Sequence, residues 1–329
     1  MNCPRLDHFV RMNSDGSLSP CGHMVRPKQF ESFEDLQNSK WIDGIKKKFS
    51  SDQWPEECAR CQQSEGTGNK SIRMHSLDRD KLLKAIKKDY LIVGGVLDNV
   101  CNSACQTCNA SLSTKIGSLQ SKNYIRVDNY VKFWELPQKK IIELDVSGGE
   151  PTASKNYKRI LENLPSNTKI IRMNTNCSRI IPEIETVLSK GIKVIITVSL
   201  DGLGKTHDYI RWPITWTQFE KNFKFYKNLE AKHKLLELDC WTTISCLNLH
   251  DFDNILEFAR INKVQHGWAF LSEPEALNVK YSNPFTTPYQ HLFPDKIAVG
   301  EDNSTQLKNF LSQQDSLRSI KINDYLSFA

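Results

Sequence analysis

Six short runs rich in apolar and β-branched residues, separated by amphipathic segments, constrain the fold of this 329-residue chain most strongly. The runs have the length of strands, and the segments between them have the apolar period of helices. Strands joined by helical crossovers predict an α/β fold with a parallel sheet, curved or barrel-like. The predicted strands are Tyr90–Leu97, Ile141–Val146, Lys169–Asn174, Lys193–Leu200, Leu235–Ser245 and Val264–Leu271. The predicted helices lie near residues 104–118, 154–163, 180–190, 216–232 and 250–262.

The two ends of the chain differ from this central pattern. Residues 1–75 are loop-rich, and the turn signal at Asn13–Gly16 predicts a hairpin between Phe9–Met12 and Ser17–Ser19. Residues 281–304 are rich in Pro, Thr, Asn and Ser and predict a loop or lid. A last helix is expected from Ser304 to Asp324.

Charge and hydropathy limit the class of protein. The net charge of +6 is mild, and lysine runs such as Lys81–Lys88 are typical of solvated helix faces, so nucleic-acid binding is not expected. No run of about 18 apolar residues exists, so no membrane span is expected. The first residues do not resemble a signal peptide, which predicts a cytoplasmic protein with reduced thiols. Ten cysteines in that setting favour metal binding over disulfides.

Three of these cysteines, Cys101, Cys105 and Cys108, lie within eight residues directly after the first central strand. Thiolates select zinc and iron–sulfur clusters. A closed zinc site needs four protein ligands, so a zinc knuckle would require a distant fourth residue. Three close cysteines without a fourth suit a four-iron cluster with one iron left open for a ligand.

Polar clusters follow the next three predicted strands. They are the segments Ser147–Thr152, Asn174–Cys177 and Ser199–Gly202. Ligands of parallel sheets bind at the carboxyl ends of strands, so these segments and the cysteine triplet are expected to share one site. Two glycines at 148 and 149 would let the backbone approach a ligand closely.

The spacing Cys101-x3-Cys105-x2-Cys108, followed by Gly148-Gly149-Glu150 after the next strand, resembles the radical S-adenosylmethionine (radical SAM) superfamily over residues 88–275. One departure is Thr107, which stands where the family often has an aromatic residue. The resemblance implies a partial (β/α)6 TIM-like barrel. It also implies a [4Fe–4S] cluster on the triplet, with S-adenosylmethionine chelated to the open iron. Such enzymes cleave S-adenosylmethionine reductively to a 5′-deoxyadenosyl radical, which abstracts hydrogen from a substrate.

The same resemblance implies which residues contact the cofactor and which partners the chain has. Ala269–Leu277 would edge the adenine, and Ser199–Gly202 with His207-Asp208-x-x-Arg211 is similar to the peptide-modifying branch. The implied substrate is therefore a peptide or protein side chain, with flavodoxin or ferredoxin as electron donor. The implied S-adenosylmethionine contacts are Gly148, Gly149, Glu150, Asn176, Ser199, Asp201 and Arg211.

A second cysteine set lies near the N-terminus and consists of Cys3, Cys21, Cys58 and Cys61. Four thiolates would close a site, and spacing alone leaves zinc and an iron–sulfur cluster open. The Cys-x12-Gly-x4-Cys spacing is similar to the start of SPASM and twitch domains, which implies an auxiliary [4Fe–4S] cluster. The implied domains are a small cysteine-rich hairpin domain at 1–80, a radical SAM core at 88–275, and a C-terminal loop and helix at 276–329.

Two rival functions stay open at this point: a nucleotide- or RNA-modifying enzyme of the same superfamily, and a non-catalytic zinc module that binds nucleic acid. The remaining cysteines, Cys177, Cys240 and Cys246, are expected to be buried thiols. The tryptophans Trp212, Trp216, Trp241 and Trp268 are expected in the core.

Overall fold

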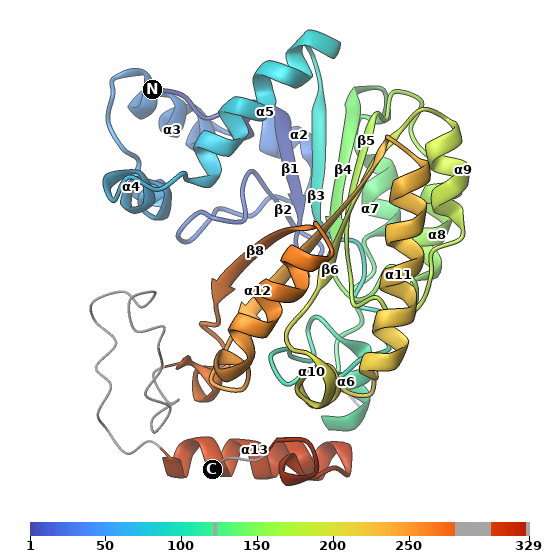
Figure 1. Cartoon of the computed structure of the whole chain (residues 1–329). Helices are drawn as coiled ribbons and strands as arrows, with labels where there is room; N and C mark the ends of the chain where they lie inside the picture. The colour runs from blue at the N-terminus through green and yellow to red at the C-terminus, as the bar shows by residue number, and fades with distance from the viewer. Residues whose placement is uncertain (121–123, 280–303, 327–329) are drawn as a thin grey trace.

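The computed structural model describes residues 1–120, 124–279 and 304–326, which form an α/β fold around one eight-stranded sheet (Figure 1). The strand order is β2-β1-β3-β4-β5-β6-β7-β8, and every neighbouring pair is parallel except β1 and β2. The strands are β1 Phe9–Met12, β2 Leu18–Ser19, β3 Leu91–Val96, β4 Ile141–Ser147, β5 Ile170–Thr175, β6 Lys193–Ser199, β7 Leu236–Ile244 and β8 Gln265–Phe270. The six predicted central strands and the predicted hairpin are confirmed.

Helices connect these strands and cover the sheet. They are α1 Arg5–His8, α2 Phe33–Gln37, α3 Lys40–Ser50, α4 Ala59–Gly66, α5 Ile72–Ile86, α6 Thr114–Gln120, α7 Tyr130–Glu135, α8 Lys155–Glu162, α9 Glu183–Ser189, α10 Gly204–Ile210, α11 Trp216–Lys232, α12 Phe252–Ile261 and α13 Ser304–Arg318. Four of the five predicted crossover helices are confirmed as α8, α9, α11 and α12.

The predicted helix at 104–118 is wrong over residues 104–113, because α6 begins at Thr114. Two backbone N–H groups of this segment bond to carbonyls far along the chain instead of to the carbonyls of a helix. Ala104 N donates to Trp212 O at 2.8 Å, and Gln106 N donates to Ile210 O at 2.8 Å. The last helix ends at Arg318 instead of Asp324, and the predicted loop at 281–304 lies almost wholly outside the described residues.

Alternation along the strands gives the sheet one apolar and one polar face. On β4 and β5, Leu144, Val146, Ile171 and Met173 belong to the main core. That core also contains apolar side chains of the crossover helices: Tyr157, Ile160, Ile184, Val187, Phe219 and Phe223. Helices α8, α9 and α11 lie together on one side of the sheet in Figure 1.

The opposite face is polar and partly open. Its members include Ser147 on β4, Asn174 on β5 and Ser199 on β6, each at the carboxyl end of its strand. Trp241 pairs in register with Ser199, and its side chain is 44% exposed. The expectation that Trp241 and Trp268 lie in the core is therefore wrong, because neither is buried.

The N-terminal hairpin is part of the same sheet, since β1 runs parallel to β3 with Val10 opposite Val93. Val10, Met12 and Leu18 share the main core with the central strands. Helix α5 crosses the predicted domain boundary at residue 80. The separate hairpin domain and the partial barrel stay predictions.

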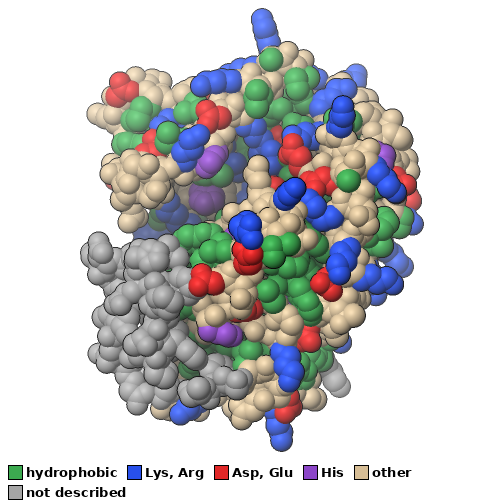
Figure 2. Space-filling view, viewed as in Figure 1, with side chains coloured by type: hydrophobic (Ala, Val, Ile, Leu, Met, Phe, Trp, Pro, Cys, Tyr) green, Lys and Arg blue, Asp and Glu red, His purple; other side chains and the backbone are tan. Residues whose placement is uncertain are grey.

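Lys and Arg side chains are spread among acidic and neutral ones over the face seen in Figure 2. Of the described helices, none is long and apolar enough to cross a membrane.

Candidate functional site

A cavity of about 350 Å³ lies where strands β3 to β6 end. It gathers most of the residues that the sequence singled out, from four separate loops. Its predicted members are Cys101, Cys105, Cys108, Gly148, Gly149, Glu150, Asn176, Ser199 and Arg211. Thr107 also lines it, whereas no residue of 269–277 does among those described.

The cysteine triplet lies in a loop held in place by distant segments. Besides the bonds to Trp212 and Ile210, the guanidinium of Arg318 in α13 donates from Nε to Ala104 O at 2.7 Å and from Nη2 to Cys105 O at 3.3 Å. Ser103 Oγ lies 3.3 Å from Cys101 Sγ and 3.5 Å from Cys105 Sγ. The loop therefore owes its shape to tertiary contacts, and its three thiols border the same space.

Burial shapes the chemistry of these thiols. Burial raises the pKa of Cys108 to about 12, with a further contribution from the neighbouring Cys105 and Cys101. Burial and Cys105 also raise the pKa of Cys101. Thiols of raised pKa become ligands when a metal supplies the compensating charge, and metal binding then releases protons. No ready-made group of three or more Cys, His, Asp or Glu that could hold a metal ion is found among the described residues. The soft donor set and the adjoining space fit an iron–sulfur cluster.

The turn after β4 needs glycine twice. Gly148 has φ +92° and Gly149 has φ +53°, both in the left-handed region. A Cβ on Gly149 would lie 2.2 Å from Val100 O, so the turn packs backbone to backbone against the start of the triplet loop. Glu150 N donates to Val100 O at 2.7 Å and joins the two segments.

Glu150, an implied contact of S-adenosylmethionine, lines the cavity, but its carboxyl group is hydrogen-bonded within the protein. Its side chain is 1% exposed and accepts from four donors. Oε1 accepts from Thr152 N at 3.1 Å, Thr152 Oγ1 at 2.8 Å and Thr175 Oγ1 at 2.7 Å, while Oε2 accepts from Asn176 N at 2.7 Å. Burial raises the pKa of Glu150 against the opposing effect of these hydrogen bonds. The carboxyl group thus ties the ends of β4 and β5 together.

Asn176 likewise holds the triplet loop. Its amide Nδ2 donates to Asn102 Oδ1 at 2.9 Å and to Ser103 Oγ at 3.3 Å. Its Oδ1 accepts from Ser178 N at 3.0 Å. The side chain borders the cavity while its polar atoms fix the loop that carries the thiols.

Arg211 and Asp201 form a buried ion pair, with Nη2 and Oδ2 2.6 Å apart. Asp201 is fully buried, does not line the cavity, and accepts from Thr243 N at 2.8 Å through Oδ1. Burial opposes the charge of Arg211, but Asp201 more than compensates and raises the pKa of Arg211. Arg211 Nη1 also lies 3.7 Å from Cys105 Sγ, so the pair places positive charge beside this thiol. Arg211, an implied contact of S-adenosylmethionine, lines the cavity and is already paired with Asp201 within the protein.

Sequence reasoning missed Arg11, which lines the cavity from β1. No motif marks this residue. Only the parallel pairing of β1 with β3 brings it to the site.

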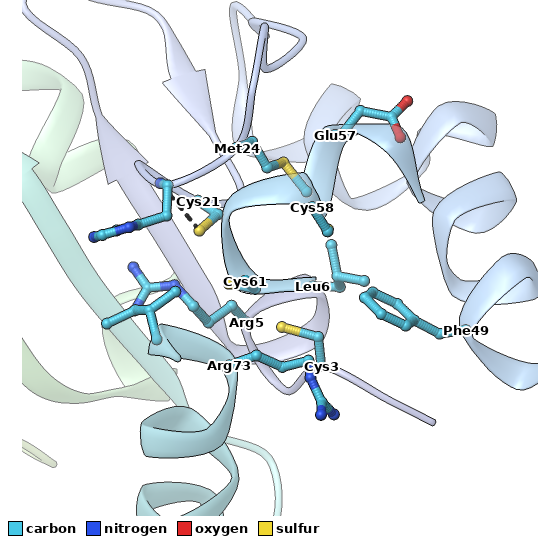
Figure 3. A pocket seen from close by; sticks show the side chains of 12 residues that line it. Cys3, Arg5, Leu6, Cys21, Met24, Phe49, Glu57, Cys58, Cys61 and Arg73 are labelled. Carbon is cyan, nitrogen blue, oxygen red and sulfur yellow. Dashed lines mark hydrogen bonds between the residues drawn. The ribbon is translucent and has the colours of Figure 1, made fainter. Parts of the chain in front are cut away.

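The four N-terminal cysteines line one small cavity of about 20 Å³ (Figure 3). Cys3 precedes α1, Cys21 follows β2, Cys58 ends the 3₁₀ helix Glu56–Cys58, and Cys61 lies in α4. Four segments that are separate in the chain therefore contribute a cysteine to the lining of one cavity.

Charged side chains of both signs surround these thiols, with Arg5 and Arg73 beside Glu57 in the lining of the cavity. Burial raises the pKa of Cys58 to about 12 and that of Cys3 to about 11. Arg5 and Arg73 line the cavity, and Arg73 forms an ion pair with Glu65. Burial and the charges of Arg5, Arg60 and Arg11 lower the pKa of His23. A four-thiolate metal centre carries net negative charge, so these arginines suit either zinc or a cluster.

The other three cysteines, Cys177, Cys240 and Cys246, are buried thiols as expected.

No family model matches this chain, and no curated protein matches it. Among solved structures, the chain is similar to Streptococcus suis SuiB bound to S-adenosylmethionine, at 15% identity and a TM-score of 0.44, over 95% of this chain and 70% of that chain. It is also similar to native anSMEcpe with bound AdoMet, at 14% identity and a TM-score of 0.43, over 70% of this chain and 62% of that chain. A third similar structure is native anSMEcpe with bound AdoMet and Kp18Cys peptide, at 16% identity and a TM-score of 0.40, over 70% of this chain and 62% of that chain. Because these TM-scores lie below 0.5, we argue the function from the geometry of the site.

Proposed function

We propose that the chain is a radical SAM enzyme whose Cys101, Cys105 and Cys108 hold a [4Fe–4S] cluster. One observation carries this proposal: the three thiols and the Gly148-Gly149 turn border a single cavity at the carboxyl ends of parallel strands. Such a cluster, once reduced, supplies the electron that cleaves S-adenosylmethionine. The protein contributes position, charge and shielding from water.

The roles of the protein groups follow from their contacts. The turn at Gly148 and Gly149 lines the cavity, and the two glycines let it pack closely against Val96 and Val100. Glu150 and Asn176 fix the loops on either side, and the Arg211–Asp201 pair places positive charge beside Cys105. In this proposal they act as positioning residues around the bound cofactor, and Ser199 borders the space left for it.

We further propose an auxiliary [4Fe–4S] cluster on Cys3, Cys21, Cys58 and Cys61. The support is their convergence on one cavity, with Arg5 and Arg73 in its lining. The proposed substrate is a peptide or protein side chain, on the resemblance of Ser199–Gly202 and His207–Arg211 to the peptide-modifying branch. Flavodoxin or ferredoxin is the proposed electron donor.

Metal analysis and product formation test the proposal. Protein purified without oxygen and reconstituted should contain about eight iron and eight sulfide per chain, as expected for two four-iron clusters. It should convert S-adenosylmethionine to 5′-deoxyadenosine when reduced. Cys101→Ala should abolish this conversion, whereas the matched control Cys246→Ala, a buried thiol outside both sites, should retain it. Retained conversion in Cys101→Ala, or zinc without iron in the wild type, would contradict the assignment.

The auxiliary site is tested separately. Cys58→Ala should lower the iron content by about half, because one of two four-iron clusters is lost. The cluster on the triplet should stay in place. Unchanged iron in Cys58→Ala would exclude a cluster at the N-terminal cysteines.

A further inference from the structure

Arg11 brings an uncompensated positive charge to the cavity of the cysteine triplet. It lies in β1, is half-buried, and lines this cavity together with Cys101, Cys105 and Cys108. In the part of the chain that the structure describes, the Arg11 side chain makes no hydrogen bond or ion pair, and its Nε is fully buried without an acceptor. A half-buried guanidinium without a partner is costly unless an anion occupies the space beside it.

The other charged side chains on this cavity already have partners. Arg211 forms an ion pair with Asp201 at 2.6 Å. The carboxyl group of Glu150 accepts from four donors. Among the described residues, Arg11 is therefore the cation on this cavity left to meet an incoming anion.

Two glycines make room for Arg11 and fix its direction. A Cβ on Gly95 of β3 would lie 2.7 Å from Arg11 Cγ. The aliphatic part of the Arg11 side chain therefore packs over Gly95, where the neighbouring strand has no side chain. A Cβ on Gly22 would lie 1.9 Å from Arg11 Nη1, so the guanidinium rests against the backbone just after Cys21. A residue larger than glycine at position 22 would have to displace the charged group from this place.

We propose that Arg11 binds a carboxylate of a molecule held in this cavity. The planar fork of a guanidinium matches a carboxylate with two parallel hydrogen bonds, and partial burial strengthens the pairing. The carboxylate comes either from the methionyl group of S-adenosylmethionine or from an acidic group of the substrate. Naming these two sources rests on the proposed function, whereas the anion site rests on the cavity itself.

Binding to the cluster-loaded full chain tests the first source. Dissociation constants are measured by calorimetry for S-adenosylmethionine and for decarboxylated S-adenosylmethionine, on the wild type and on Arg11→Gln. If Arg11 holds the methionyl carboxylate, Arg11→Gln weakens S-adenosylmethionine binding at least ~10-fold, the scale of a lost charge-assisted hydrogen bond. Binding of the decarboxylated form then changes little. Arg11→Lys keeps the positive charge but lacks the planar guanidinium, so its affinity for S-adenosylmethionine should lie between those of the wild type and Arg11→Gln.

The second source is tested by thermal unfolding with S-adenosylmethionine bound, in acetate and in chloride at equal ionic strength. If the site serves a substrate acid, acetate raises the Tm of the wild type by about 2–4 °C more than that of Arg11→Gln, because a ligand of the folded state alone is stabilising. The matched control Arg260→Gln removes an exposed arginine of α12 and should behave as wild type in both measurements.

Unchanged S-adenosylmethionine affinity in Arg11→Gln, together with equal acetate shifts in all variants, would overturn the proposal. A failure of the proposed function appears elsewhere, as a wild type that yields no 5′-deoxyadenosine. In that event the acetate measurement, made without S-adenosylmethionine, still decides whether Arg11 binds an anion.

Discussion

At the scale of single residues, the site depends on space left by missing side chains as much as on reactive groups. The backbone of Gly149 packs against the backbone of Val100. The absence of side chains at Gly22 and Gly95 leaves the space that the Arg11 side chain occupies. A thiol loop and a turn can approach this closely only where no Cβ intervenes.

Gly149→Ala should lower the free energy of unfolding by about 1–3 kcal/mol, because the new Cβ meets Val100 O and the backbone has positive φ. Urea unfolding measures the change. The control is Gly44→Ala in α3, where a Cβ meets nothing within 4 Å and alanine favours the helix, so a gain of about 0.5–1 kcal/mol is expected. Equal effects at the two positions would contradict the packing described here.

His207 should make stability depend on pH. The ring is fully buried against Phe219 and Trp216, and burial, with the charge of Arg211, lowers its pKa from 6.5 to about 3. Below pH 6.5 the unfolded chain takes up a proton that the folded chain refuses, so the free energy of unfolding falls by up to about 1.4 kcal/mol per pH unit down to about pH 3. His207→Phe should lack this part of the slope in urea titrations between pH 4 and 7. A variant with the wild-type slope would show that other groups cause it.

At the scale of elements, helix α8 is joined to the loop that leads into the cysteine triplet. Ser154 Oγ accepts from Tyr157 N at 2.9 Å as the N-cap of α8 and donates to Asp98 Oδ2 at 2.5 Å. Asp98 is 2% exposed, and burial raises its pKa. One hydroxyl group thus starts a helix and satisfies a buried carboxyl group.

Ser154→Ala should therefore lower the free energy of unfolding by more than the loss of a helix cap alone. We expect about 2–3 kcal/mol of stability, because the cap is lost and Asp98 loses a buried partner. Ser32→Ala removes the exposed N-cap of α2 and should cost about 1 kcal/mol. Chemical denaturation of both variants gives the comparison, and equal losses would show that the Asp98 contact adds nothing.

At the scale of the whole molecule, the triplet loop is hydrogen-bonded to two segments far along the chain, one at Ile210 and Trp212 and the other at Arg318. Arg318, 4% exposed in α13, donates to the carbonyl oxygens of Ala104 and Cys105, more than 200 residues away. The C-terminal helix thereby contributes directly to the position of the loop that carries the cysteine triplet.

Arg318→Met should leave these two carbonyls without their donors and loosen the loop. We expect a loss of about 2–3 kcal/mol, typical of hydrogen bonds to a charged group, and faster amide hydrogen exchange in residues 101–108. Lys308→Met, on an exposed position of the same helix, serves as the control. Exchange followed by mass spectrometry measures the change, and unchanged protection at 101–108 in Arg318→Met would rule out this role.

The sequence by itself determined the six central strands and singled out Cys101, Cys105 and Cys108 as candidate ligands. Local periodicity predicted the six central strands because alternation and β-branching act over a few residues. The Gly148-Gly149 pair after a strand predicted a tight turn, because glycine adopts positive φ without strain. The expectation that polar strand ends meet at one edge follows from parallel topology, and residues from each of the three polar segments line the cavity.

Only the tertiary structure decided how charges pair and which further residues join the site. Asp201 forms an ion pair with Arg211, and the carboxyl group of Glu150 accepts hydrogen bonds from Thr152 and Thr175. Strand β1 places Arg11 at the cavity. Such pairings depend on strand order and loop packing between residues far apart in the chain. No local pattern encodes them, because the energy of a buried charge is set by whichever neighbours the fold places beside it.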